Sequence, residues 1–259
     1  MQFPAMLHLG PFLIHPHPLL ETLGYFLGFR LYVYLRRESG DVVVDIHRLL
    51  VLTASIVGGA VGSKVLAWLE NPAATLAQLS TPQALLGGKS IVGGLLGGLI
   101  AVELAKRHQG VHTHTGDLFS LPLIVGMAIG RIGCFLTGLD DHTFGVATTM
   151  PWGIDFGDGV LRHPTQLYEI AFLGLLALAV VHAGRRMRTG SLVQGDQFKL
   201  FMVGYLAWRL AIDFLKPDLR WALGLSGIQL ACVAGLIYYA PHIPRIARWK
   251  GALRSWHTP

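Results

Sequence analysis

The sequence predicts an all-α membrane protein with about seven transmembrane helices. Only 14% of the residues are charged, whereas a soluble domain usually carries about 25%. The mean hydropathy is +0.50, and many of the 32 glycines lie inside apolar runs at spacings of three or four residues. In lipid, small residues at such spacings let helix backbones approach closely. A water-soluble globular fold is therefore excluded.

Seven apolar stretches are long enough, or nearly so, to cross a bilayer, which takes about 20 helical residues. The third is short, and the first contains Glu21 and Arg30. The stretches cover residues 19–35, 49–69, 90–105, 118–137, 165–183, 198–215 and 225–239.

Basic residues follow every second stretch, and cytoplasmic loops carry such an excess of Lys and Arg. This pattern places the N-terminus in the periplasm and the C-terminus in the cytoplasm. Residues 1–18 contain no basic segment of the kind that opens a cleavable signal peptide, so the first helix is expected to direct insertion. The basic groups are Arg36 and Arg37, Lys106 and Arg107, Arg185, Arg186 and Arg188, and Arg245, Arg248, Lys250 and Arg254.

The whole chain, 1–259, is predicted to form a single polytopic membrane domain. Its polar segment 139–161, rich in Gly and Asp, joins the fourth and fifth stretches and is expected to form a periplasmic cap. The net charge of +6 resides largely in the loops, where it sets topology and contacts anionic membrane lipids. No nucleic-acid partner is expected.

Ionisable side chains at membrane depth are rare and usually functional. Arg131 follows the apolar run 121–129 within the fourth stretch, and Tyr205, Arg209 and Asp213 recur at every fourth residue of the sixth. This spacing puts the last three on one helix face. Arg209 and Asp213 can pair there, either within a functional site or as an ion pair that only joins helices.

The second and third stretches combine small residues with a single lysine. Gly93 and Gly97, and Gly94 and Gly98, form two adjacent ridges that another helix or a lipid chain can approach. Lys64 follows a face of small residues. Its side chain either extends to the membrane–water interface or belongs to a functional site.

No metal site, organic cofactor or disulfide is predicted. The His-x-His pairs at 15–17 and 112–114 lack a third and fourth ligand pattern. The acidic segment 140–142 is typical of a turn. Cys134 is interpreted as a small apolar packing residue, because the spacing implies no adjacent base.

The polar residues at membrane depth suit a phospholipid headgroup. Two guanidinium groups, Arg131 and Arg209, can bind a phosphate bidentately, and the phosphate would compensate their otherwise unpaired charge. Glu169 and His163 are candidate proton carriers for a reaction beside that phosphate. Lys64, Tyr205 and Gln166 complete the set.

Three motifs resemble a known family. Residues 130–135 read Gly-Arg-Ile-Gly-Cys-Phe, similar to the family's Gly-Arg-x-Gly-Asn-Phe. Residues 162–169 read Arg-His-Pro-Thr-Gln-Leu-Tyr-Glu, and 205–213 match a Tyr-x-x-x-Arg-hydrophobic-x-x-Glu helix with a terminal Asp. The chain thus resembles the prolipoprotein diacylglyceryl transferases, seven-span bacterial inner-membrane enzymes that move diacylglycerol from phosphatidylglycerol to the lipobox cysteine of exported prolipoproteins.

The chain departs from the family pattern at several positions. Val92 replaces the histidine of a His-Gly-Gly-Leu motif, and Cys134 and Thr137 replace two signature asparagines. Leu139 replaces a glutamate. These changes affect groups expected to orient or deprotonate the acceptor, while the two arginines remain.

The resemblance implies a transferase in which Arg131 and Arg209 bind the headgroup phosphate, with Glu169 or His163 as base. The partners implied are phosphatidylglycerol and an exported prolipoprotein or another periplasmic acceptor. Two alternatives remain: a paralogue using the same donor with a non-lipoprotein acceptor, and a non-catalytic phospholipid-binding membrane protein. The implied substrate-binding residues are Tyr205, Gln166, Lys64, Gly93, Gly94 and Asp213.

Overall fold

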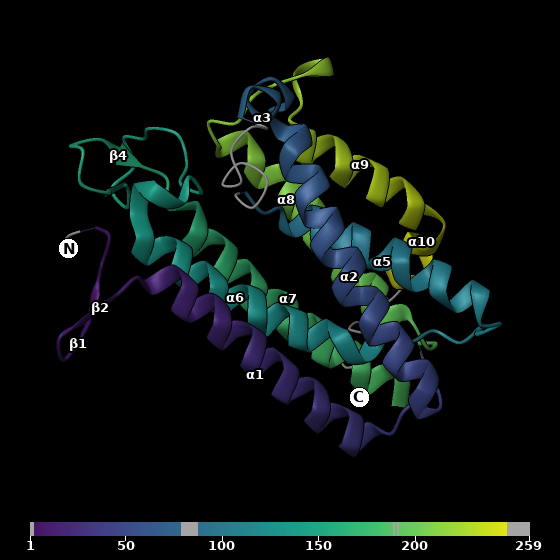
Figure 1. Cartoon of the computed structure of the whole chain (residues 1–259). Helices are drawn as coiled ribbons and strands as arrows, with labels where there is room; N and C mark the ends of the chain where they lie inside the picture. Colours follow the sequence, from purple (N-terminus) through teal and green to yellow (C-terminus); the bar gives the residue numbers. More distant parts are fainter. Residues whose placement is uncertain (1–2, 79–87, 189, 191, 248–259) are drawn as a thin grey trace, which may run out of the picture. The chain divides into compact units, whose positions relative to one another are not determined.

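The computed structural model describes residues 3–78, 88–188, 190 and 192–247, and it is mostly helical (Figure 1). The chain forms two compact units. Unit 1 contains Met1–Gly40, Gly116–Trp208 and Phe214–Pro217. Unit 2 contains Asp41–Thr115, Arg209–Asp213 and Asp218–Pro259.

Three long helices form the body of unit 1: α1 (Pro16–Ser39), α6 (Ser120–Thr137) and α7 (Thr165–Arg188). Helix α6 contacts both α1 and α7, and the three run side by side in Figure 1. Most of α8 (Asp196–Ile212) also belongs to this unit. The short elements are β1 (Leu7–Leu9), β2 (Phe12–Ile14), β3 (Ile154–Asp155), β4 (Leu161–Arg162), η1 (Asp117–Phe119), η2 (Gly138–Asp141) and η3 (Asp213–Leu215), the last shared with unit 2.

Unit 2 is organised around α2 (Asp45–Glu70) and α5 (Ile91–His108), which pack along one another. Helix α9 (Gly227–Tyr239) contacts both of them. A capping box starts α9, because the Ser226 side chain accepts from the Gln229 amide and the Gln229 side chain accepts from the Ser226 amide. The remaining elements are α3 (Pro72–Gln78), η4 (Ala222–Gly224), η5 (Ala240–His242) and α10 (Ile243–Ala247).

Each of the seven predicted apolar stretches coincides with a helix, so the helical class is confirmed. Three helical segments are long and apolar enough to cross a membrane: Asp45–Glu70, Asp117–Asp141 and Thr165–Met187. Helices α8 and α9 have 17 and 13 residues, fewer than the roughly 20 that a perpendicular crossing takes.

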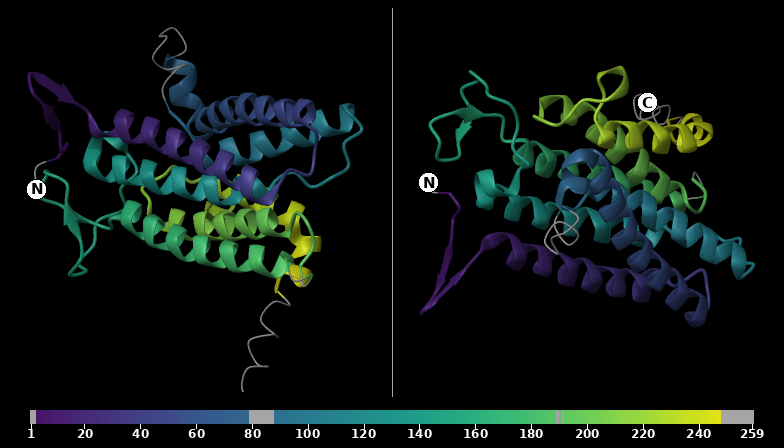
Figure 2. Two further views of the ribbon diagram at one scale, coloured as in Figure 1. Left: turned by 90° about the horizontal axis from the view of Figure 1, so that it is seen from below. Right: turned by 45° about the horizontal axis from the view of Figure 1, so that its top comes forward.

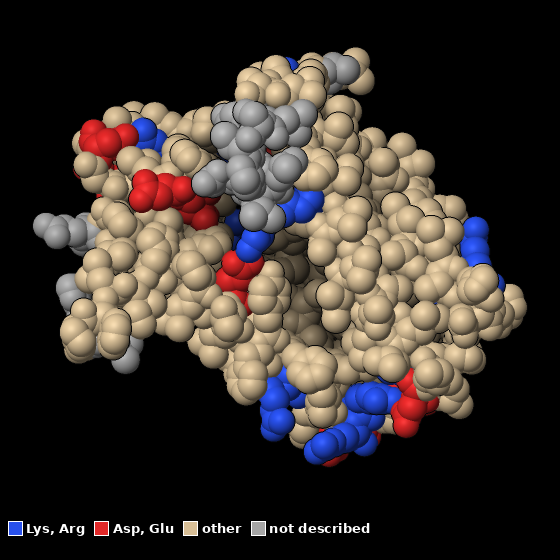
Figure 3. All heavy atoms as spheres, viewed as in Figure 1, with Lys and Arg blue, Asp and Glu red and all other residues tan. Residues whose placement is uncertain are grey.

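Large apolar side chains point away from the helices into the surroundings. Ile56 on α2 and Leu178 on α7 are each 69% exposed. On the face shown in Figure 3, charged side chains form only a few small groups and the remaining surface is uncharged. Such a surface is unfavourable in water and suits contact with lipid.

Glycines bring α2 and α5 into backbone contact. A Cβ on Gly97 would lie 2.4 Å from the Gly58 carbonyl oxygen, and one on Gly93 would lie 2.3 Å from that of Gly62. The ridge of Gly93 and Gly97 therefore packs against another helix, one of the two partners predicted for it. Unit 1 repeats this arrangement, because a Cβ on Gly24 of α1 would lie 2.8 Å from the Gly126 oxygen of α6.

Replacing Gly97 by alanine is expected to lower the free energy of unfolding by about 1–3 kcal/mol, because the added methyl group has no space between two backbones. Gly174→Ala is the matched control: it adds the same methyl to a helical glycine with nothing within 4 Å. Unfolding of both variants in detergent, followed by circular dichroism, measures the difference. Equal stability of the two variants would contradict the close α2–α5 contact.

The segment predicted as a cap folds at one end of the α1, α6 and α7 group. Its backbone pairs through the Gly145 amide with the His163 oxygen at 2.9 Å and through the Thr148 amide with the Leu161 oxygen at 2.8 Å. Phe156 is buried and contacts Phe3 near the N-terminus at 5.1 Å between ring centroids. Both views in Figure 2 show the β1–β2 hairpin and this segment at the same end of unit 1.

Asp117, in the turn before α6, fixes the beginning of α8. Its carboxylate accepts hydrogen bonds from the backbone amides of Gly195 at 2.6 Å and Phe198 at 2.9 Å. Gly195 immediately precedes α8 and Phe198 lies in its first turn, where backbone N–H groups have no intrahelical partner. The start of α8 therefore depends on a side chain far away in the sequence.

Candidate functional site

Predicted site residues of unit 1 meet between α6, α7 and α8. The Nε of Arg131 lies 2.9 Å from the Oε2 of Glu169, and the Tyr205 hydroxyl donates to the Oε1 of Glu169 at 2.8 Å. All three residues are buried. Three predicted site residues from separate helices are thus in direct contact.

Gln166 lies three residues before Glu169 in the first turn of α7, so the two share a helix face. Its side chain is buried at 1% exposure. Neither its amide oxygen nor its amide nitrogen has a hydrogen-bond partner in the described part of the chain. A buried amide left unsatisfied costs about 1–3 kcal/mol. This residue is therefore available to bind a substrate group.

One premise of the phosphate hypothesis is wrong. The charge of Arg131 is not uncompensated, because Glu169 pairs with it. Arg209 likewise has Asp213 as its partner. A phosphate is therefore not required to neutralise either guanidinium, and a headgroup at Arg131 would use N–H groups that Glu169 does not occupy. A guanidinium carries five N–H donors, more than one carboxylate can use.

His163 stands just before α7, half-buried, with its Nδ1 3.2 Å from the Tyr168 hydroxyl. That hydroxyl also accepts from the indole nitrogen of Trp152 at 2.7 Å. Arg162, the first residue of the same motif, donates to Asp158 at 2.6 and 2.7 Å. These bonds lower the pKa of the Asp158 carboxyl, and they join the last part of the predicted cap to the residue that follows it.

In unit 2, the predicted pairing of Arg209 and Asp213 is confirmed, with Nη2 to Oδ1 at 3.0 Å. Asp213 also accepts a short hydrogen bond from the Ser226 hydroxyl. Arg220 donates to the backbone oxygen of Asp213 at 2.8 Å and to the side-chain oxygen of Gln229 at 2.6 Å. The roles of Ser226 and Arg220 in this network were not predicted, because both lie in the irregular segment before α9.

The other predicted residues of unit 2 lie on α2 and α5. The ammonium of Lys64 donates to the Gly88 backbone oxygen at 2.9 Å. Gly93 is buried against Gly62, and a Cβ on Gly94 would be in ordinary contact with Gly59 at 3.5 Å. These contacts give both glycines a packing role, and their contact with substrate stays a prediction.

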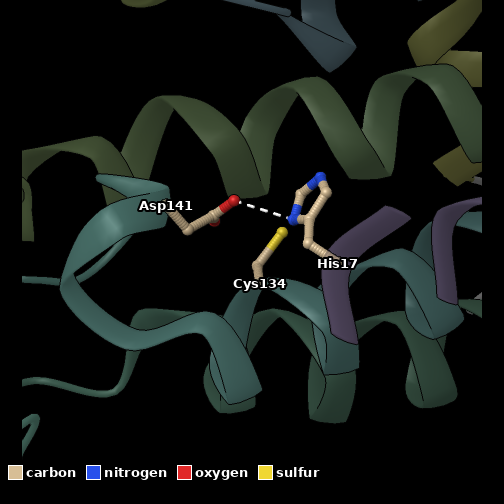
Figure 4. Close-up of side chains that lie close together, drawn as sticks. All are labelled: His17, Cys134 and Asp141. Atoms are coloured by element: carbon tan, nitrogen blue, oxygen red, sulfur yellow. Dashed lines mark ion pairs between the residues drawn. The ribbon is translucent and has the colours of Figure 1, made fainter. Parts of the chain in front are cut away.

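A second cluster in unit 1 was not predicted as a site. His17 Nδ1 lies 2.8 Å from Asp141 Oδ1, and Cys134 Sγ lies beside both (Figure 4). The turn expected at 140–142 is present, since η2 ends at Asp141 and His142 has a left-handed φ of 53°. The inference that Cys134 has no base beside it is wrong, because α1 supplies one. No local pattern could have shown this contact between α1 and α6.

Comparison with known proteins identifies the family of the chain. Residues 4–242 match the family model for prolipoprotein diacylglyceryl transferase. A protein of Wolbachia sp. subsp. Brugia malayi is 32% identical over 228 residues, covering 83% of this chain and 82% of that protein. One from Cupriavidus necator is 33% identical over 241 residues, covering 88% and 85%.

A third relative, from Rhodospirillum rubrum, is 31% identical over 244 residues and covers 90% of this chain and 87% of its own length. All three relatives carry the name phosphatidylglycerol–prolipoprotein diacylglyceryl transferase. The match extends over nearly the whole chain and includes the residues that meet around Arg131. The chain belongs to the prolipoprotein diacylglyceryl transferase family.

Proposed function

We propose that this protein transfers diacylglycerol from phosphatidylglycerol to the lipobox cysteine of an exported prolipoprotein. The observation that carries the proposal is the buried cluster of Arg131, Glu169 and Tyr205 beside the unsatisfied amide of Gln166. This cluster lies in a protein whose named relatives catalyse that transfer.

Arg131 is the residue that we assign to the headgroup phosphate in unit 1. Glu169 fixes the guanidinium from one side, and Tyr205 in turn holds Glu169. A charged donor fixed in advance stabilises the charge that develops on the departing glycerol phosphate without reorganising during the reaction. Tyr205 is therefore a positioning residue.

Gln166 and His163 are proposed to face the substrates. The free amide of Gln166 can donate to a headgroup oxygen and accept from a glycerol hydroxyl. His163, half-buried at the start of α7, is our candidate base for the acceptor thiol. Glu169 is the other candidate, although its two oxygens already contact Arg131 and Tyr205.

Arg209 is proposed to serve the same reaction from unit 2. This proposal comes from the sequence motif at 205–213, and the pairing of Arg209 with Asp213 supports it by fixing the guanidinium. The same motif motivates a role for Asp213 in holding that arginine. Lys64, Gly93 and Gly94 remain proposed substrate contacts.

We further propose that the chain spans the bacterial inner membrane seven times as one polytopic domain. The N-terminus and the cap at 139–161 would lie in the periplasm and the C-terminus in the cytoplasm. The three apolar helices and the exposed apolar side chains support membrane insertion. The distribution of Lys and Arg supports the orientation.

The test is lipidation of a lipobox peptide by the purified protein in phosphatidylglycerol-containing nanodiscs, followed by mass spectrometry. The expected product is the peptide with one diacylglyceryl group attached through its cysteine sulfur. A peptide with serine in place of that cysteine is the control and should remain unmodified. No product, with phosphatidylglycerol demonstrably bound, would contradict the prolipoprotein acceptor and favour another one.

The non-catalytic alternative makes a different prediction about His163 and Glu169. In an enzyme, His163→Ala and Glu169→Gln are expected to reduce transfer by about 10²–10⁴ if the residue carries the proton. Phosphatidylglycerol binding should be less affected than turnover in both variants. Unchanged transfer rates in both would rule out each residue as the base.

A further inference from the structure

Three side chains of metal-ligating type converge outside the Arg131 cluster. They come from three elements: His17 from the start of α1, Cys134 from the last turns of α6, and Asp141 from the end of η2. Their ligand atoms all lie within 4.8 Å of one another. In Figure 4 the imidazole nitrogen, the sulfur and the carboxylate oxygen face a common point. None of the three has a role in the proposed transfer.

The atoms that face away from this point contact other groups. The Oδ2 of Asp141 accepts from the Thr143 hydroxyl at 2.5 Å, which leaves Oδ1 for the cluster. The Nε2 of His17 lies 3.8 Å from a carboxylate oxygen of Glu21. In metal sites a ligating histidine almost always directs its other ring nitrogen to a carboxylate, a backbone carbonyl or a water. The Thr143 hydroxyl therefore holds the Asp141 carboxylate in the orientation that coordination needs, and the Glu21 carboxylate lies near the other ring nitrogen of His17.

The donor set identifies the metal. Thiolate sulfur, imidazole nitrogen and carboxylate oxygen are the three ligand types of zinc, whereas magnesium and calcium prefer oxygen alone. A thiolate and a carboxylate also neutralise a divalent cation, which suits a site where Cys134 is buried. The His17 side chain is 29% exposed, so an ion can reach the cluster.

We propose that His17, Cys134 and Asp141 bind a zinc ion. Three protein ligands leave one tetrahedral position open, as in catalytic zinc sites. The cluster adjoins the headgroup site, because the Nη1 of Arg131 lies 3.7 Å from Cys134 Sγ. A ligand in the open position would therefore be close to the arginine assigned to the phosphate.

The role of this zinc, which depends on the proposed function, is to take the acceptor cysteine in its open position. A thiol bound to a metal is deprotonated, and its proton passes to water. The thiolate sulfur then forms a bond to the terminal glyceryl carbon, and the bond between that carbon and the phosphate oxygen breaks. The electron pair leaves with glycerol phosphate. This assigns a function to the replacement of a signature asparagine by Cys134 in a chain that also has Val92 in place of the family histidine.

Metal analysis of the full-length protein tests the site without reference to activity. The protein in detergent is incubated with zinc or cobalt and passed through a desalting column. The amount of metal that stays bound is then measured by elemental mass spectrometry. About one zinc per chain is expected, and the cobalt form should show the charge-transfer absorption of a bound thiolate. A wild-type protein that retains no metal would overturn the proposal.

Variants of the ligands, compared with a matched cysteine, locate the metal. Cys134→Ser and Asp141→Asn are close to isosteric and are expected to lower zinc retention at least tenfold, with unchanged helical circular dichroism. Cys232→Ser is the control, because Cys232 is also buried but lies on α9 in unit 2. Retention of zinc by Cys134→Ser, or its loss only from Cys232→Ser, would overturn the assignment.

Lipidation of the peptide by metal-free protein tests the catalytic role of the zinc separately from its binding. Removal of zinc with a chelator is expected to reduce transfer, and zinc added back should restore it. If zinc binds as predicted but its removal leaves the rate unchanged, the role in thiol activation is wrong. If zinc binds and no lipidated peptide forms under any condition, the proposed acceptor is wrong and the metal site stands.

Discussion

Replacing Arg131 by alanine is expected to reduce diacylglyceryl transfer by a factor of about 10²–10³, the usual cost of removing one donor that stabilises transition-state charge. The variant also leaves the buried carboxylate of Glu169 without its cation. Breaking a buried ion pair by removing one partner costs about 3–5 kcal/mol of stability. Transfer of diacylglycerol to the peptide and unfolding in detergent measure the two effects.

A second variant separates these effects. Combining Arg131→Ala with Glu169→Gln removes both charges, so most of the lost stability should return while transfer stays low. Arg131→Lys keeps the charge but loses the planar fork that binds a phosphate bidentately, and should transfer at an intermediate rate. A near-normal rate in Arg131→Ala would show that this residue does not bind the headgroup.

Replacing Arg209 by alanine is the second change with a large expected effect. It leaves the fully buried carboxylate of Asp213 with the Ser226 hydroxyl but without the Arg209 guanidinium. We expect a loss of about 3–5 kcal/mol in stability. If Arg209 binds the phosphate, a fall in transfer of about 10²-fold or more is also expected.

Arg209→Ala combined with Asp213→Asn isolates the contribution of the arginine to transfer, because it removes the unpaired charge. The control is Arg30→Ala in α1, an arginine that is exposed and outside both clusters. It should leave transfer and stability nearly unchanged. A double variant that is both stable and active would restrict Arg209 to a structural ion pair.

Features that depend on local spacing could be predicted from the sequence. The pairing of Arg209 with Asp213 followed from their separation by one helical turn, and the contact of Gly93 and Gly97 with another helix followed from small residues four apart. The long helices followed from apolar runs. In each case the information lies within a few turns of one helix.

Contacts between distant helices could not be predicted in the same way. The sequence predicts Glu169 as a candidate proton carrier, and nothing local indicates that it pairs with Arg131 on another helix. The contact of His17 with Asp141 depends on the packing of α1 against α6, where Gly24 and Gly126 let the two backbones meet. Periodicity shows which face of a helix is polar, but it does not show which neighbouring helix that face contacts.

The carboxylate of Asp117 has a consequence for the order of biosynthesis. Ribosomes make the N-terminal part of a chain first, so this acceptor has already been synthesised when Gly195 and Phe198 emerge. The nascent α8 can complete its first turn only by docking onto material translated earlier. If α8 formed before Asp117 was in place, the amides of Gly195 and Phe198 would lack their acceptor. Assembly during translation is therefore the favoured route to the native chain.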